Sequence, residues 1–211
     1  FLYSTIPGQS ILANHFSPLL AILSPLFLVW DNARILFVAQ AVSVALSGIP
    51  LYQLVRSRHP ALAPWFLLAY YLNPALHKVT VFEFRRIVLA MPFLALALYA
   101  LYHKKRLLMM VGLLLALLCK ENVGFIVFMV GLYLVIFERD WRWGISYTVL
   151  GAAWLVVVSL WVIPAFAPPD RPLDVYPQLY YFGDLGDSPA AIVDNLARDP
   201  TILLGRLFGR E

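Results

Sequence analysis

The sequence has little of what soluble, secreted or metal-binding proteins commonly use. Only 13% of its 211 residues are charged, and it has one cysteine, Cys119, inside an apolar run. A single cysteine excludes a disulfide framework and a cysteine-based metal site. There is no N-x-Ser/Thr sequence, and we find no nucleophilic triad signature, phosphate-binding glycine loop or dinucleotide fingerprint. The familiar soluble enzyme classes therefore have no support.

Hydrophobic residues are what the sequence has in excess. They make up 62% of the chain, and the mean hydropathy is +0.78. Soluble domains are about half apolar and about a quarter charged, and 211 residues cannot hide this much apolar surface from water. The composition predicts an integral membrane protein. The chain starts at Phe1 without a signal-peptide pattern, and we expect it to be a fragment of a longer protein.

Seven apolar stretches follow one another along the chain. Crossing a bilayer takes about 20 helical residues, so the shorter stretches need flanking residues or do not cross. The stretches are 16–30, 33–55, 61–76, 87–102, 107–119, 123–137 and 143–163.

Basic residues between these stretches predict the topology. The net charge is +4, and most basic residues lie in short clusters between the apolar stretches. Such clusters indicate how the chain is oriented in the membrane, and they do not suggest a nucleic-acid partner. Loops 56–59, 103–106 and 138–142 are basic, and Lys and Arg concentrate in cytoplasmic loops. Placing all three inside gives six crossings. Residues 16–30 then have both ends outside, so we expect a helix lying in the outer interface.

The predicted fold is therefore all-α: a polytopic transmembrane bundle over 1–163 and an extracytoplasmic tail over 164–211. Prolines in 164–172 end the last span. The run 183–189 has turn chemistry, and Ser188 can cap a short amphipathic helix that ends at about Arg198.

Three polar clusters are expected at the outer face. Ionisable groups at membrane depth are costly and are functional candidates, although each cluster has a simpler explanation. Lys120 can snorkel to the headgroups, the aromatic and charged run at 82–86 can form an interfacial belt, and His15 can cap a helix. The candidate binding residues are His15, Glu83, Arg85, Arg86, Lys120, Glu121 and Asn122, beside Asn14, His77 and Lys78.

A metal site is the weaker interpretation of these polar residues. No His-x-x-x-His pair and no His and carboxylate at one-turn spacing lies on a helix. His15, His77 and Glu83 would have to converge in space to bind a divalent ion, so no metal or other cofactor is assigned.

Four motifs together carry a resemblance. They are Asn14-His15-Phe16-Ser17-Pro18, Phe82-Glu83-Phe84, Lys120-Glu121-Asn122 and Trp161-Val162-Ile163-Pro164. Over nearly the whole chain this pattern resembles a bacterial membrane-protein family, domain of unknown function 2079. The order of elements also resembles the C-type (GT-C) glycosyltransferase superfamily, in which a His or Lys before Pro-rich apolar sequence starts an interfacial helix.

The resemblance implies a polyprenyl-phosphate-linked sugar donor and an acceptor at the outer face of a bacterial cytoplasmic membrane. It also implies a carboxylate base in the first extracytoplasmic loop. That loop would precede Phe1, so no catalytic residue is assigned. The family usually has Phe-Asp-Phe-His-Pro-Glu where this chain has Phe82-Glu83-Phe84-Arg85-Arg86-Ile87. The substitution removes a His and a second carboxylate that acid–base or metal chemistry would use there.

Three functions remain open. The first is an inverting, lipid-linked sugar transferase in which His15, Arg85, Arg86 and Lys120 stabilise the leaving phosphate. The second is a non-catalytic scaffold subunit that keeps the fold and binds other membrane subunits. The third is a transporter with broken helices around a midplane site, which fits the half-length runs but not charges gathered toward one face.

Overall fold

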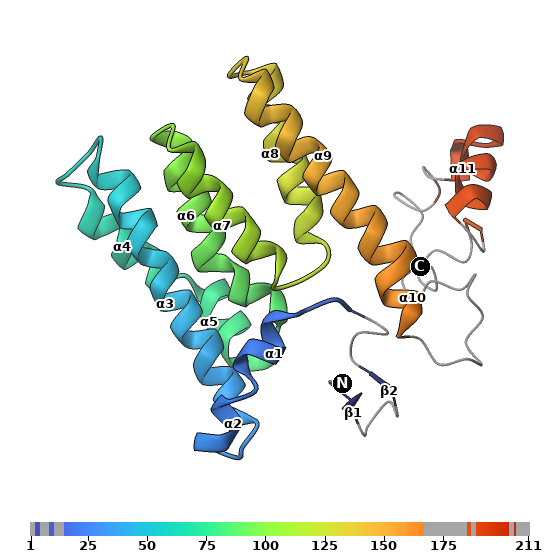
Figure 1. The fold of residues 1–211 in the computed structure, drawn as a ribbon. Helices are drawn as coiled ribbons and strands as arrows, with labels where there is room; N and C mark the ends of the chain where they lie inside the picture. Colours follow the sequence, from blue (N-terminus) through green and yellow to red (C-terminus); the bar gives the residue numbers. More distant parts are fainter. Residues whose placement is uncertain are drawn as a thin grey trace.

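The chain folds into three helical hairpins that stand side by side (Figure 1). The computed structural model describes residues 3–4, 9–10, 15–166, 185–186, 189–202 and 205. The first hairpin is α3 (Arg34–Arg56) with α4 (Ala63–Tyr71), the second is α6 (Met91–Tyr102) with α7 (Arg106–Leu117), and the third is α8 (Val123–Ile136) with α9 (Trp141–Val157). This described part confirms the predicted helical class.

The third hairpin is packed through glycines. A Cβ added at Gly151 would lie 2.4 Å from the backbone nitrogen of Phe128 and 2.6 Å from the carbonyl of Gly124. Gly131 is equally close to the backbone of Thr148. Small residues let membrane helices approach until their backbones touch, which makes α8 and α9 one rigid unit.

The stretch expected to cross as one span, 61–76, is two helices. Helix α4 ends at Tyr71, and α5 (Pro74–Phe82) starts after it. Pro74 lacks an N–H and forces an extended backbone on Asn73, whose side-chain oxygen accepts a hydrogen bond from Ala75 N at 2.9 Å. The apolar stretch 61–76 is therefore divided at Asn73 and Pro74, and helix α5 extends beyond it to Phe82.

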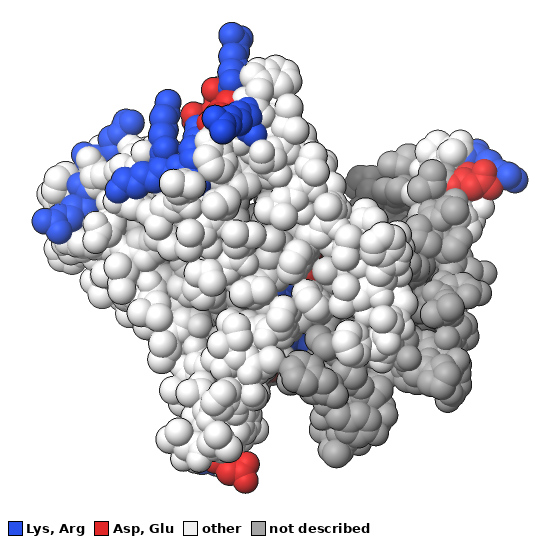
Figure 2. All heavy atoms as spheres, in the orientation of Figure 1, with Lys and Arg blue, Asp and Glu red and all other residues white. Residues whose placement is uncertain are grey.

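The three hairpin tips lie on one face of the bundle, at the top of Figure 1, and Lys and Arg gather there in Figure 2. Two tips are closed by residues in the left-handed conformation, Lys104 (φ 57°) and Arg139 (φ 55°). The tips are also joined electrostatically. Arg106 Nε donates to Asp140 Oδ2 at 2.8 Å, and its Nη2 lies 3.4 Å from Glu138 Oε2. This network fixes α7 against the start of α9.

The other end of the bundle carries the shorter elements. The expected interfacial helix at 16–30 is two short helices, α1 (Leu19–Leu23) and α2 (Leu26–Val29), that are separated at Ser24 and Pro25. Both lie near the end of α3 away from the tips (Figure 1). A two-residue strand pair that the sequence did not predict, β1 (Tyr3–Ser4) with β2 (Gln9–Ser10), precedes them.

The last span continues beyond α9 through the π-helical turn η3 (Val158–Val162) into α10 (Ile163–Ala165). Helix α11 (Pro189–Arg198) agrees with the amphipathic helix expected in the tail. Asn14, Ser188, and most of the Pro-rich and turn segments at 164–172 and 183–189 lie outside the described residues.

Helix length limits what the structure says about crossings. Only Arg34–Arg56 and Trp141–Ala165 are long and apolar enough to cross a membrane, among the described residues. Segments 19–29, 86–102, 106–117 and 123–136 are apolar but shorter. Six crossings are therefore not confirmed.

Apolar side chains cover the outside of the bundle. Leu28 is 89% exposed, Val81 77% and Phe137 73%, whereas the buried side chains include the polar Ser17, Gln40 and Ser47. An apolar exterior around a partly polar interior is the arrangement that a lipid solvent favours.

Candidate functional site

The turn between α7 and α8 and the segment before α1 meet at Glu121. Its Oε1 lies 2.9 Å from His15 Nδ1, and its Oε2 accepts a hydrogen bond from Phe16 N at 3.1 Å. The two residues are more than a hundred positions away from Glu121 in the sequence. The segment before α1 and the Lys120–Asn122 break are therefore in direct contact.

Further contacts hold the segment before α1 in place. Leu19 N donates to Leu118 O at 2.9 Å, and the ring of Phe16 packs edge-on against Trp154 of α9 at 5.5 Å. Ser17 is buried between these anchors. The α7–α8 turn is therefore covered by a segment from the start of the chain.

A second turn, between α5 and the 3₁₀ helix η2 (Arg86–Ala90), carries Glu83, Arg85 and Arg86. Glu83 forms an ion pair with Arg85. The backbone of this turn is held by Gln40 of α3, which is fully buried and bonds to both Glu83 and Arg85. The sequence analysis did not select Gln40. The feature that could have identified it is a polar amide side chain within the long apolar run 33–55.

The two turns enclose a polar cavity of about 300 Å³. It is lined by Glu83, Phe84, Arg85, Arg86, Ile87 and Lys120. His15, which was expected to share one cavity with Glu83, Arg85 and Lys120, is not among these lining residues. Three cationic side chains thus face one carboxylate. Within the described chain neither Arg86 nor Lys120 forms an ion pair with an acidic side chain, although Arg86 lies within electrostatic range of Glu121.

Helix lengths place this cavity deep within the bundle. At about 1.5 Å per residue, α3 is about 35 Å long, whereas α7 is about 18 Å and α8 about 21 Å. Since all three hairpin tips share one face, the α7–α8 turn is recessed from the opposite end of α3 and α9, as Figure 1 shows. In Figure 2 the charged atoms between the two ends lie inside a hollow.

The local charges keep Glu121 ionised. Burial alone would raise the pKa of its carboxyl group, but the hydrogen bond from His15, its own backbone N–H, and the nearby charges of His15 and Lys120 outweigh burial. The pKa of Glu121 is lowered as a result. A carboxylate stabilised in this way is suited to holding His15 rather than to accepting a proton.

Some candidates lie elsewhere. Asn122 is exposed and makes no side-chain capping bond at the start of α8. His77 Nε2 lies within hydrogen-bond distance of the carbonyl of Tyr71, and Lys78 is exposed on α5. In the described chain no three His, Cys, Asp or Glu side chains come close enough to share a metal ion, so the His15, His77 and Glu83 cluster does not form.

The recessed polar turns and the motifs that form them agree with a known family. The family described as "Predicted membrane protein (DUF2079)" matches residues 1–211. The chain belongs to this family. No curated protein and no solved structure matches it. Membership establishes a predicted membrane protein of unknown function.

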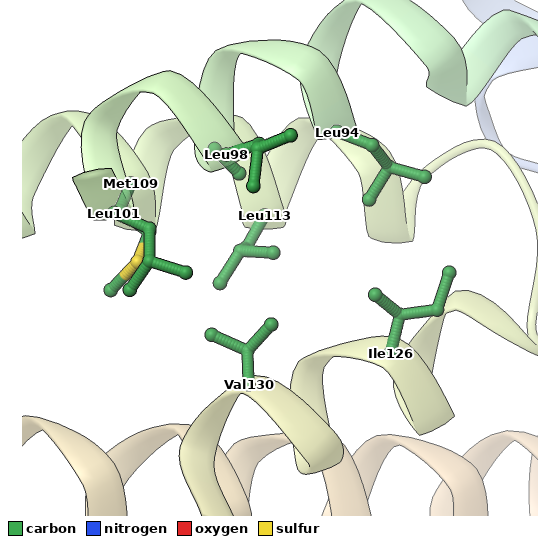
Figure 3. A pocket seen from close by; sticks show the side chains of 8 residues that line it. Leu94, Leu98, Leu101, Met109, Leu113, Ile126 and Val130 are labelled. Atoms are coloured by element: carbon green, nitrogen blue, oxygen red, sulfur yellow. The ribbon is translucent and has the colours of Figure 1, made fainter. Parts of the chain in front are cut away.

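The DUF2079 chain also has apolar cavities beside its polar one. A cavity of about 170 Å³ lies between hairpin α6–α7 and helix α8, where Ile126 and Val130 face Leu94 and Leu98 across a gap (Figure 3). Another, of about 420 Å³, lies between α1, α3 and α6 and includes Leu19, Leu89 and Phe93. This chain thus has both a cationic pocket and hydrocarbon-lined cavities.

Proposed function

We propose that this chain is a GT-C-like membrane glycosyltransferase that binds a polyprenyl-phosphate-linked sugar at the outer side of a bacterial cytoplasmic membrane. The observation that carries the proposal is the recessed cavity, which Arg85, Arg86 and Lys120 line together with Glu83, and in which neither Arg86 nor Lys120 forms an ion pair among the described residues. Cations held at membrane depth without matching carboxylates are costly unless an anion joins them.

The proposed topology has six crossings. The hairpin tips, with their seven Lys and Arg residues, lie in the cytoplasm. Helices α3 and α9 cross the whole bilayer, and α7 and α8 complete their crossings through the recessed turn, whose cavity opens to the outer side. Helices α1 and α2 lie in the outer interface.

The proposed ligand is an amphiphile with a phosphate. Guanidinium groups bind phosphate oxygens in pairs, and a lysine adds a point charge. The apolar cavity between α6, α7 and α8 is a separate space that lies along the two helices joined by the Lys120 turn. That arrangement suits a phosphate in the polar pocket and a hydrocarbon chain beside it.

In the proposed transfer, an acceptor hydroxyl oxygen forms a bond to the anomeric carbon as the bond from that carbon to the phosphate oxygen breaks. The phosphate leaves with the electron pair, and Arg86 and Lys120 stabilise its charge. The acceptor proton goes to a carboxylate. Glu83 and Glu121 are second choices for that base, because Arg85 and His15 already hold them.

This pairing favours a second candidate, a non-catalytic scaffold subunit of a larger membrane complex. Both carboxylates at the site are occupied by internal cations, and Arg85-Arg86 replaces the family's His-Pro. Such a subunit would still bind the lipid phosphate but would transfer nothing.

Cysteine labelling tests the topology. A Cys119→Ala background removes the native thiol, and single cysteines then replace Lys104 at a tip and Glu83 at the recessed turn. We expect membrane-impermeant reagents to reach these positions from opposite sides. Labelling of both from one side would overturn the threading.

Ligand binding and turnover test the function. Lys120→Ala and Arg86→Ala should each weaken binding of undecaprenyl phosphate by about tenfold, since one charge-assisted contact is worth about 1.5–3 kcal/mol. Lys78→Ala is the matched control, because Lys78 is an exposed lysine on α5. Purified protein would be titrated with the lipid and its thermal stability followed.

Three outcomes decide between the candidates. Site-dependent binding, with transfer of sugar from a polyprenyl-phosphate donor to an acceptor, supports the enzyme. Site-dependent binding in the full-length protein without transfer supports the scaffold. Binding unchanged in both site variants would overturn the phosphate pocket and leave Lys120 as a snorkelling residue.

A further inference from the structure

Gln40 makes an unusually complete set of hydrogen bonds. Its Nε2 lies within hydrogen-bond distance of three carbonyls, those of Val79 at 2.9 Å, Thr80 at 3.1 Å and Glu83 at 3.1 Å, which share its two hydrogens. Its Oε1 accepts from the backbone N–H of Arg85 at 2.7 Å. The side chain is fully buried. All these partners belong to the end of α5 and the turn that carries the cations.

These hydrogen bonds satisfy carbonyl groups at the end of helix α5 that have no partner within the helix. The last four carbonyls of an α-helix have no partner within the helix, and Val79 and Thr80 are two of them. The chain then becomes extended at Glu83, with φ −153° and ψ 155°. In hydrocarbon surroundings an unpaired carbonyl costs several kcal/mol. Gln40 therefore caps α5 from a different helix.

The same bonds fix the direction of the turn. One amide group ties Glu83 O and Arg85 N to one point on α3, so the backbone on both sides of Phe84 is set. The amide orientation follows from its partners, since three carbonyls need the NH₂ group and one N–H needs the oxygen. Arg86 follows at once as the first residue of η2.

We propose that Gln40 is a positioning residue that holds the turn at 83–85 so that Arg85 and Arg86 point into the cavity with Lys120. Gln40 does not line that cavity; it acts through the backbone. The inference rests on the proposed phosphate site. It goes further in assigning the geometry of the site to α3, a helix outside the recessed turns.

A purely structural role makes a different prediction. If Gln40 serves only folding, its loss lowers stability and leaves phosphate affinity as it was. If it positions the arginines, its loss also weakens binding, and the weakening depends on the arginines being present. The second behaviour is a coupling that stability alone cannot produce.

The experiment compares Gln40→Met with Ser47→Ala. Ser47 is another buried polar residue of α3, and it bonds to Val44 O and Tyr70 instead of the turn. Both variants should lose thermal stability. Gln40→Met should weaken undecaprenyl phosphate binding by about tenfold, the loss expected for one misplaced charge-assisted contact, and Ser47→Ala should not.

A double-mutant cycle adds the decisive readout. In an Arg86→Ala background, Gln40→Met should cost less affinity than it does alone, because part of its effect passes through Arg86. Fully additive effects, or unchanged affinity in Gln40→Met, would overturn the inference. If the wild type does not bind the lipid at all, the proposed function fails first.

A spin label gives a readout without ligand. A label on a cysteine replacing Phe82, which is exposed at the end of α5, reports the motion of the turn. We expect greater mobility in Gln40→Met and Gln40→Asn than in Ser47→Ala. If neither Gln40 variant folds, Gln40 is a folding residue and the inference is wrong.

Discussion

The two charged regions of the bundle differ in how deeply their unpaired cations are buried. At the hairpin tips Arg106 is shared by Asp140 and Glu138, and Glu138 also lies 3.7 Å from Lys104. Every carboxylate there has a cation. At the recessed turns the cavity has three cations and one carboxylate. The other six Lys and Arg of the tip loops are exposed, whereas Arg86 and Lys120 are half-buried at the cavity and form no ion pair among the described residues. The recessed turns therefore hold partly buried positive charge that a ligand can pair with.

This difference separates charges that hold the fold from charges available for binding. Arg106 is only 13% exposed and its carbonyl accepts a hydrogen bond from Tyr147 at 3.0 Å. It is built into the interface of α7 with α9. Lys120 lines an open cavity and makes no ion pair among the described residues. Substitutions in the two regions should therefore affect different measurements.

Arg106→Met should give the largest effect, a loss of about 3 kcal/mol in the free energy of unfolding. Removing the shared cation leaves Asp140 and Glu138 partly buried with reduced pairing, and breaking a buried ion pair costs about 3–5 kcal/mol. Denaturation in detergent followed by circular dichroism measures it.

The matched control is Lys104→Met on the same tip. Lys104 is 74% exposed, and such surface pairs contribute about 0–1 kcal/mol. Similar losses in both variants would show that the tip network is a surface feature and not part of the helix interface.

Charge reversal should show the next largest effect. Lys120→Glu should weaken undecaprenyl phosphate binding by about a hundredfold, because it adds repulsion to the loss of one charge-assisted contact. Lys105→Glu, a reversal at the tips, should leave binding unchanged. Equal effects from both reversals, in titrations at one salt concentration, would mean that net charge and not the cavity attracts the lipid.

Sequence patterns predicted the helical class because apolar stretches and basic loops are local signals. They did not indicate where a proline divides an apolar stretch into two helices. Asn73 and Pro74 split one expected span, and Ser24 and Pro25 split the expected interfacial helix. Two helices of membrane length do not establish six crossings, since α7 and α8 end early at the Lys120 turn.

The sequence predicted the charged residues of the site, but it did not predict the residues that hold them in position. Lys120, Arg85 and Arg86 interrupt apolar runs. Because a charged side chain in lipid has a high free energy, residues of this kind are recognisable as functional candidates from the sequence. The contact between His15 and Glu121 joins distant segments, and the sequence indicated only that both face one side. Gln40 carries no charge, and its four backbone partners come from tertiary packing.

A smaller effect is expected from the carboxylate of Glu121. Glu121→Gln should lose about 1 kcal/mol of unfolding free energy at pH 7, because an ionised acceptor for His15 and Phe16 becomes neutral. The pKa of Glu121 is lowered on folding. Its stabilisation is therefore present above the ordinary value of 4.5 and is lost as pH falls through the folded value.

Thermal unfolding between about pH 6 and about pH 3 checks this sign, because the window brackets a carboxyl pKa lowered from its reference value. The wild type should lose stability toward low pH more steeply than Glu121→Gln. Parallel curves would show that the carboxylate of Glu121 contributes nothing through its charge.

The smallest effect should come from a cation at the tips that no carboxylate holds. The guanidinium of Arg58 lies over the ring of Tyr102 at 5.3 Å, which joins the first hairpin to the second. Exposed cation–π contacts contribute about 0.5–1 kcal/mol, so Arg58→Ala should lower unfolding free energy by about 0.5 kcal/mol and Tyr102→Leu by a similar amount. Neither substitution should alter the binding of undecaprenyl phosphate, because the contact between Arg58 and Tyr102 lies at the end of the bundle away from the cavity. A clear loss of binding in Arg58→Ala would show that the exposed cations of the tips also attract the anionic ligand. The distinction between exposed tip cations and the half-buried cations of the cavity would then be wrong.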